Sequence, residues 1–196
     1  MIELDNVVFS YGDRKILDGV SLTLPDGAHA ALLGPSGQGK TTLLRLILGL
    51  EQPDSGSVRV TGRIGCVFQE PRLLPWCTAL ENVCAVLPEE KTASREASRW
   101  LEALELSDAA GLFPGALSGG MQQRLALARA LAYGGDILLL DEPLTGCDGA
   151  LRRRMLELLR RETCGKTLLL VTHDADVAGA LTDCSYLLQS GSVSIM

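Results

Sequence analysis

A glycine-rich loop between a strand-like and a helix-like segment constrains this chain most. Residues 34–42 read Gly-Pro-Ser-Gly-Gln-Gly-Lys-Thr-Thr and match the pattern G-x-x-x-x-G-K-[ST]. Apolar residues 30–33 precede the loop, and residues 41–50 follow it with helical periodicity. The glycines let backbone N–H groups turn inward, and the N-terminus of the following helix adds to a cradle for phosphate oxygens. The loop therefore predicts a phosphate-binding site.

The side chains of the loop extend this prediction to a nucleotide with its metal ion. Lys40 supplies a positive charge for the β- and γ-phosphates, and Thr41 offers a hydroxyl to Mg²⁺. The residues that we expect to bind the nucleotide here are Gly34, Pro35, Ser36, Gly37, Gln38, Gly39, Lys40, Thr41 and Thr42.

Two acids follow a continuous apolar run further along the chain. Residues 137–140 read Ile-Leu-Leu-Leu, as expected of a strand that is buried on both faces, and Asp141 and Glu142 come next. Open α/β sheets bind ligands at the carboxyl ends of their strands. We expect Asp141 to hold Mg²⁺ and Glu142 to polarise the attacking water as general base.

Strand-like and helix-like segments alternate along most of the chain, which favours an α/β fold with a parallel sheet. The expected strands cover residues 2–9, 21–24, 28–33, 64–68, 137–140, 167–172, 185–188 and 192–195. The expected helices cover residues 40–50, 96–106, 120–133, 150–162 and 175–181. Residues 69–135 break the alternation with consecutive helices. We interpret residues 1–196 as one domain, with a core of residues 1–68 and 136–196 and an inserted helical subdomain at about 69–135.

Composition narrows the classes of partner. The net charge of −6 does not favour binding to nucleic acid, and the arginines at 152–154 and 160–161 are interpreted as a solvated helix face. The six cysteines form no C-x-x-C pair, so we expect free thiols. We find neither a signal peptide nor an apolar stretch long enough to span a membrane, and therefore expect any membrane role to come through a partner.

A second glycine-containing segment carries the decisive resemblance. Residues 117–124 read Leu-Ser-Gly-Gly-Met-Gln-Gln-Arg, followed by a helical run. Here the chain resembles the ATP-binding-cassette (ABC) ATPases, whose signature reads LSGGQ or LSGGM followed by Q-R. Ser118, Gly119 and Gly120 place small residues and free amides at a helix start, which predicts a second anion site.

The resemblance covers essentially the whole chain and implies a P-loop NTPase fold with an antiparallel β subdomain near the N-terminus. It also implies roles for four further residues. Tyr11 occupies the position of an aromatic that stacks on adenine, and Gln69 lies in a glutamine loop that senses Mg²⁺ and faces the transport partner. Asp148 lies in a loop that communicates across a dimer, and His173 matches a switch histidine that contacts the γ-phosphate.

In this family two subunits pack head to tail. The resemblance therefore implies an ATPase homodimer in which each ATP lies between Lys40 of one subunit and Ser118 and Gly120 of the other. Contacts to the γ-phosphate from both sides would hold the dimer together until hydrolysis removes them.

Three kinds of cassette protein remain open: an importer subunit, an exporter subunit, and a soluble protein such as one serving iron–sulfur assembly. Residues 67–76, Val-Phe-Gln-Glu-Pro-Arg-Leu-Leu-Pro-Trp, are similar to those of the bacterial nitrate/sulfonate/taurine importer ATPases. That similarity implies a transmembrane permease partner, an extracytoplasmic solute-binding protein acting indirectly, and a peripheral location on the cytoplasmic face of the membrane. Leu73, Leu74 and Trp76 would anchor a permease helix, or alternatively pack in the core of the helical subdomain.

The segment before Asp148 departs from the family pattern. Thr145-Gly-Cys147 stands where Ser-Ala-Leu is more usual before the aspartate. This difference concerns the contact between subunits rather than hydrolysis.

Overall fold

The computed structural model describes residues 1–88 and 90–196, which fall into two compact units. The first unit comprises Met1–Ile64, Asp136–Asp141 and Thr163–Met196. The second comprises Gly65–Gly135 and Glu142–Glu162. The two units are described in turn. None of the helices in the described part of the chain is long and apolar enough to cross a membrane.

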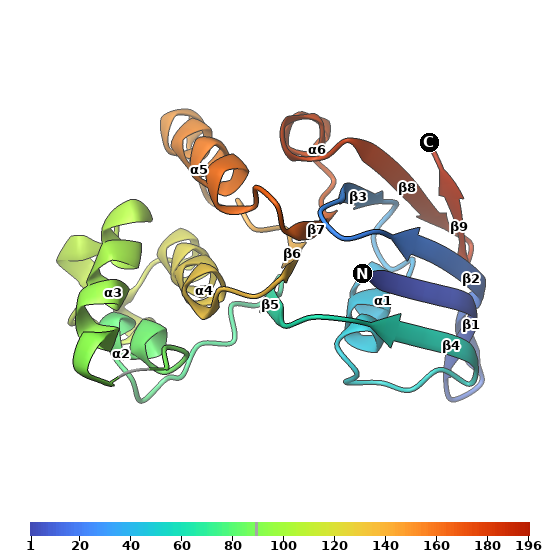
Figure 1. Cartoon of the computed structure of the whole chain (residues 1–196), viewed down its shortest axis with the longest axis horizontal. Coiled ribbons are helices and arrows are strands. Elements are labelled where there is room, and N and C mark those ends of the chain that lie inside the picture. The colour runs from blue at the N-terminus through green and yellow to red at the C-terminus, as the bar shows by residue number, and fades with distance from the viewer. Residues whose placement is uncertain (89) are drawn as a thin grey trace. The chain divides into compact units, whose positions relative to one another are not determined.

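A mostly parallel sheet forms the centre of the first unit (Figure 1). Within the first unit the strands of this sheet lie in the order β6-β7-β3-β8-β9. The chain passes from the first unit into the second within β5. The strands are β3 (His29–Leu33), β5 (Ile64–Val67), β6 (Ile137–Asp141), β7 (Thr167–Val171), β8 (Cys184–Gln189) and β9 (Ser192–Ile195). Only β9 pairs antiparallel among β3 and β6–β9. Every residue of β6 and β7 is buried, which explains their unbroken apolar sequences.

A smaller antiparallel sheet belongs to the same unit. Its order is β2-β1-β4, with β1 at Ile2–Tyr11, β2 at Arg14–Leu24 and β4 at Ser55–Val60. Alternate residues of β1 and β2 are buried, as in strands with one face on a core. The helices of this unit are α1 (Lys40–Ile47) and α6 (Ala175–Leu181). The two sheets confirm the expected α/β class with an antiparallel part near the N-terminus.

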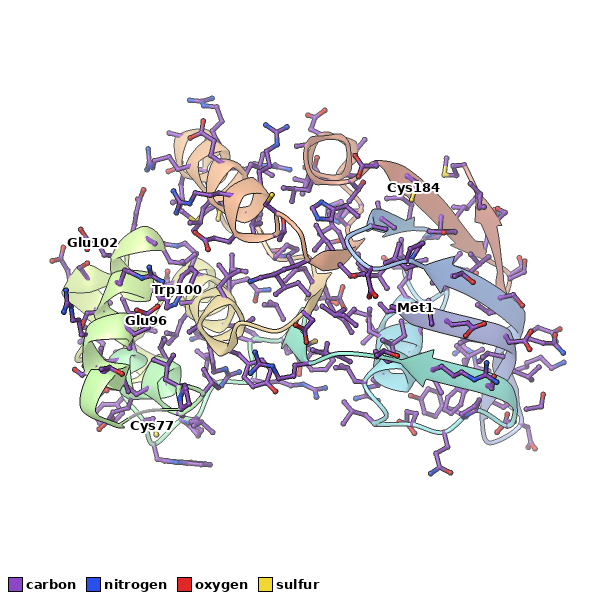
Figure 2. All side chains as sticks on the ribbon, viewed as in Figure 1. Met1, Cys77, Glu96, Trp100, Glu102 and Cys184 are labelled. Carbon is purple, nitrogen blue, oxygen red and sulfur yellow. The ribbon has the colours of Figure 1, made fainter. Side chains whose placement is uncertain are left out.

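The second unit is helical. It contains α2 (Ala79–Cys84), α3 (Glu90–Ala103), α4 (Gly119–Tyr133) and α5 (Gly149–Glu162), with short 3-10 turns at Ser107–Ala109 and Pro114–Ala116. Helices α2, α3 and α4 pack on one another. On α3, Trp100 is buried while Glu102, also labelled in Figure 2, is exposed, so one face of this helix packs and the other meets solvent.

Two smaller predictions concern side chains. Within the described residues no disulfide joins the six cysteines, among them Cys77 and Cys184, which are labelled in Figure 2. Helix α5 buries Met155, Leu158 and Leu159 and exposes most of its arginines.

Candidate functional site

Three strands of the first unit end at the same edge of the sheet. In the parallel register, Val171 of β7 lies beside Leu32 of β3 on one side and Asp141 of β6 on the other. The segments that leave these strands are the glycine-rich loop, the acidic pair and Thr172-His173. The fold therefore brings the phosphate loop, Asp141 and His173 to one edge, where open α/β sheets bind ligands.

The phosphate loop has a backbone that two of its glycines make possible. Gly34 has φ 146°, and a Cβ there would lie 2.2 Å from the carbonyl oxygen of Leu188. Gly39 has φ 99°, and a Cβ there would lie 2.7 Å from a methyl of Ile16. Gly39 is also the N-cap of α1 and offers no side-chain cap, and the first turn carries no acid. The helix start thus has the features of an anion site.

Side chains hold the loop in place on both sides. Lys40 Nζ donates to the carbonyl oxygens of Gly34 at 2.6 Å and Pro35 at 2.9 Å, so its ammonium group lies over the loop. Gln38 Oε1 accepts a hydrogen bond of 2.8 Å from the backbone N–H of Ser190, in the turn between β8 and β9. Sequence reasoning missed Ser190, because only the fold brings this turn to the loop.

A cavity of about 290 Å³ adjoins this part of the loop. Its lining combines the loop, the start of β2 and the β8–β9 turn, and consists of Arg14, Lys15, Ile16, Asp18, Gly37, Gln38, Ser190 and Gly191. Within this lining Lys15 Nζ donates to Asp18 Oδ1 at 3.0 Å, so Arg14 and the polar backbone of the loop are the groups that suit an anionic ligand.

The proposed metal ligands of the first unit are in contact. Thr41 Oγ1 donates to Asp141 Oδ2 at 3.0 Å. Asp141 is only 3% exposed, and a carboxylate is rarely buried to this extent unless it has a partner such as a hydroxyl group or a cation. A hydroxyl and a carboxylate are oxygen ligands of the kind that Mg²⁺ takes in nucleotide sites, so these residues fit the ion.

Tyr11 and His173 are both placed in the first unit. The Tyr11 ring is 43% exposed at the end of β1 and packs edge-on against Phe9, and its hydroxyl lies 3.3 Å from both Glu51 Oε1 and Arg45 Nη1. His173 is exposed just after β7, and Asp174 next to it caps α6 by accepting from two backbone N–H groups. His29, the other histidine, has both ring nitrogens 3.1 Å from backbone carbonyl oxygens and is structural.

The signature residues begin a helix of the second unit. Ser118 is the N-cap of α4, and its Oγ accepts from the backbone N–H of Met121 at 3.3 Å. Gly120 approaches Gly146 so closely that a Cβ on Gly120 would lie 2.9 Å from the Gly146 carbonyl oxygen. Gly146 itself has φ 78°, and a Cβ there would lie 3.1 Å from the Cα of Gly120, so the glycine that departs from the family pattern permits this close backbone contact with the signature.

The remaining candidate residues also belong to the second unit. Gln69 is exposed in the segment that follows β5. Glu142 has φ 49°, a left-handed backbone that a residue with a side chain rarely adopts. Asp148 accepts from the backbone N–H groups of Ala150 and Leu151 and so caps α5.

Charges near Asp148 form a network within the second unit. Arg154 of α5 hydrogen-bonds to Glu105, and this bond lowers the pKa of the Glu105 carboxyl. Arg124 of α4 donates to the carbonyl oxygens of Leu104 and Glu105 at 2.7 and 3.0 Å. Burial raises the pKa of the Cys147 thiol, which therefore stays protonated at neutral pH.

The candidate residues thus divide between the two units. The phosphate loop, Asp141, His173 and Tyr11 lie in the first unit, and Gln69, Ser118–Gly120, Glu142 and Asp148 lie in the second. Glu142 follows Asp141 directly in the chain, so the acidic pair lies where one unit passes into the other.

Comparison with known proteins gives a consistent result. The family model described as ABC transporter matches residues 17–145. An aliphatic sulfonates import ATP-binding protein of Nocardia farcinica is 44% identical over 188 residues, covering 95% of this chain and 77% of the relative. Its counterpart in Granulibacter bethesdensis is 43% identical over 196 residues, covering 99% and 82%.

Solved structures agree with the sequence relatives. The dimeric structure of MJ0796, a bacterial ABC transporter cassette, matches with a TM-score of 0.92 at 33% identity, covering 99% of this chain and 97% of that one. A dimeric post-hydrolysis state of the same cassette, bound to ADP and Pi, matches with a TM-score of 0.91 at 32% identity, with the same coverage.

Proposed function

Because this chain belongs to the ABC transporter ATPase family, and is an ATP-hydrolysing cassette, we propose that it powers a membrane importer. The observation that carries the site assignment is the edge of the sheet where β3, β6 and β7 end. There the glycine-rich loop follows β3, Asp141 ends β6 and His173 follows β7. Thr41, at the end of the loop, is hydrogen-bonded to Asp141. These are the parts that a nucleotide triphosphate with a divalent ion requires.

We assign the chemistry to this chain's residues as follows. The N–H groups of the loop and the start of α1 bind the phosphate oxygens, and Lys40 neutralises their charge. Mg²⁺, when bound, neutralises charge on the β- and γ-phosphates. Thr41 and Asp141 would hold that ion, with Gln69 as a further ligand. Glu142 orients and deprotonates the attacking water, and His173 contacts the γ-phosphate.

The second anion site belongs to a different nucleotide in this proposal. Ser118, Gly119 and Gly120 complete the site of a partner copy, and Asp148 carries the contact between copies. The dimeric cassettes among the structural neighbours support such an arrangement. Tyr11 stacks on the adenine ring. One cassette, residues 1–196, then comprises a catalytic core of residues 1–68 and 136–196 and a helical subdomain of about 69–135.

Import is favoured over the two alternatives, export and soluble iron–sulfur assembly, because the curated relatives are named import ATP-binding proteins. As such a subunit, the chain would lie on the cytoplasmic face of the membrane, bind a permease, and serve an extracytoplasmic solute-binding protein indirectly. The solute class in the names of these relatives is aliphatic sulfonates, and we extend it to this system as a proposal.

Replacement of Lys40 tests the nucleotide site. Lys40→Ala removes the only cationic side chain of the loop, and we expect it to weaken ATP binding by on the order of 100-fold and to abolish turnover. Fluorescence titration with a labelled nucleotide and phosphate release measure both. Lys166→Ala, a lysine of the same unit outside the loop, is the control and leaves both unchanged. Intact turnover in Lys40→Ala would refute the phosphate-loop assignment.

A further inference from the structure

A buried glutamine of the signature helix contacts two loops that carry candidate catalytic residues. Gln123 lies on α4 and is 3% exposed. Its Nε2 donates to the carbonyl oxygen of Phe68 at 3.2 Å and to that of Glu142 at 3.3 Å. Phe68 directly precedes Gln69. One side-chain amide therefore joins the backbones of the glutamine loop and of the acidic pair, and all these residues belong to the second unit.

The contact with Glu142 occurs where the backbone is strained. Glu142 has φ 49°, and a non-glycine residue in this region persists only when its surroundings hold it there. Three donors point at its carbonyl oxygen: Gln123 Nε2, the backbone N–H of Thr145 at 3.3 Å and Thr145 Oγ1 at 3.1 Å. Because the backbone conformation sets the direction of the Cα–Cβ bond, these donors help to fix the direction in which the Glu142 side chain leaves the backbone.

The glutamine loop is attached to the same helix at a second place. Arg129, also on α4, donates to the carbonyl oxygens of Pro71 at 3.2 Å and Arg72 at 2.8 Å. Helix α4 itself begins with Ser118, the residue that we assign to a partner's nucleotide. A displacement of α4 would therefore shift the backbone at both Gln69 and Glu142.

We propose that Gln123 is a positioning residue for ATP hydrolysis. Its amide holds Glu142 in the left-handed backbone conformation that aims the carboxylate, and it ties the start of the glutamine loop to the helix that carries the signature. Through Gln123, binding of a partner's nucleotide at the signature alters the position of the general base, Glu142. This inference rests on the proposed role of Glu142.

The first test is Gln123→Met, which keeps the length of the side chain and removes both amide protons. Misplacement of a catalytic group by about 1 Å costs on the order of 100-fold in rate. We expect kcat at saturating MgATP to fall between about 10- and 100-fold. The KM for ATP should stay within about threefold, since the phosphate loop is untouched. An unchanged kcat would overturn the proposal.

A double variant separates positioning from general loss of structure. If Gln123 acts through Glu142, then Gln123→Met added to Glu142→Gln lowers the residual turnover no further, because residues that act as a unit are non-additive. Multiplicative losses would overturn the proposal. Full turnover in Glu142→Gln alone would instead refute the proposed general base. Loss in Glu142→Gln without loss in Gln123→Met refutes only the positioning role.

The chain offers a control in a buried threonine outside the proposed site. Thr167 is 1% exposed at the start of β7, the end of that strand away from His173, and its Oγ1 accepts from the backbone N–H of Gly27 at 3.0 Å and donates to the carbonyl oxygen of Pro25 at 3.4 Å. We expect Thr167→Val to lose thermal stability and to keep kcat within about twofold. An equal loss of kcat in both variants would mean that the effect is structural, and would overturn the proposal.

If Gln123→Met does not fold, Thr145 provides a second route to the same carbonyl. Thr145→Val removes the hydroxyl at constant shape and should lower kcat with little change in the KM for ATP, whereas Thr145→Ser keeps the hydroxyl and should retain kcat. Equal rates in the valine and serine variants would overturn the positioning of Glu142 by these donors.

Discussion

Single residues determine the shape of the phosphate loop, because its backbone runs close to β8. At Gly34 the obstacle is the backbone carbonyl of Leu188, which cannot move aside as a flexible side chain can. The positive φ of this residue adds conformational strain for any other amino acid. The sequence motif requires glycine here for the approach of phosphate, and the structure adds a second requirement from within the protein.

We predict that Gly34→Ala destabilises the folded chain by about 2–4 kcal/mol, in addition to impairing nucleotide binding. Chemical denaturation measures the free energy of unfolding. Gly179→Ala is the matched control, because Gly179 lies in α6 without a positive φ and a Cβ there meets nothing within 4 Å. It should stabilise by about 0.5–1 kcal/mol through helix propensity. Equal stability of Gly34→Ala and the parent would contradict the steric argument.

Residues that the motifs single out also serve the local fold. Ser118 and Asp148 each cap a helix, α4 and α5 respectively. Capping alone would explain a serine or an aspartate at these positions. The proposed roles in a dimer therefore depend on the surrounding sequence and on the family, since local geometry accounts for the side chains without them.

At the scale of elements, the strands and helices with strong periodicity follow the sequence closely. Strands β6 and β7 and helix α6 were all predictable, because apolar runs or a clear cap define them. Strand β4 was missed. Its six residues read Ser-Gly-Ser-Val-Arg-Val, and none of them is fully buried. Pairing with β1, rather than a local sequence pattern, therefore makes this segment a strand.

Helix α2 was missed for a different reason. It has only six residues, although a capping box between Thr78 and Glu81 marks its start. Helix α3 begins at Glu90, whereas the predicted helix begins at residue 96. Among the described side chains in the first turns of α3, only those of small residues, Ala93 and Ala97, are buried. Small buried residues in a polar segment give a weak periodic signal.

The turn before α2 presents the proposed permease contact. Buried Asn82 holds this turn, accepting from the N–H of Leu74 and donating to the carbonyls of Leu74 and Cys77. Trp76 is 73% exposed, so core packing does not account for it. Leu73 and Leu74 are half-buried. The turn thus holds a large aromatic side chain in solvent, as an interface anchor requires.

We predict that Trp76→Ala lowers co-purification with the permease at least about tenfold, because loss of an aromatic anchor costs about 2 kcal/mol or more. ATP binding by the isolated chain should be unchanged. Tyr133→Ala, which removes another exposed aromatic of the same unit, should leave co-purification intact. Wild-type recovery of the permease with Trp76→Ala would rule out the docking role.

For the whole molecule, the α/β class and the order of the motifs were available from the sequence, because strand and helix periods and short motifs are local signals. The proposed role of Gln123 could not be predicted from the sequence. It depends on contacts with the carbonyl oxygens of Phe68 and Glu142, two residues that are far apart in the chain. The phosphate loop and the signature begin helices in different compact units. In our account each supplies part of an anion site, and a second copy of the chain joins the two parts.

The most direct test of this account is the mass of the Glu142→Gln variant in light scattering, alone and with its permease. With MgATP the variant binds nucleotide without hydrolysing it, and we predict that the mass of the isolated chain doubles from 20.9 kDa. Without nucleotide, or with Ser118→Arg added to obstruct the signature, it should stay monomeric. Absence of any ATP-dependent dimer in both settings would contradict the shared site.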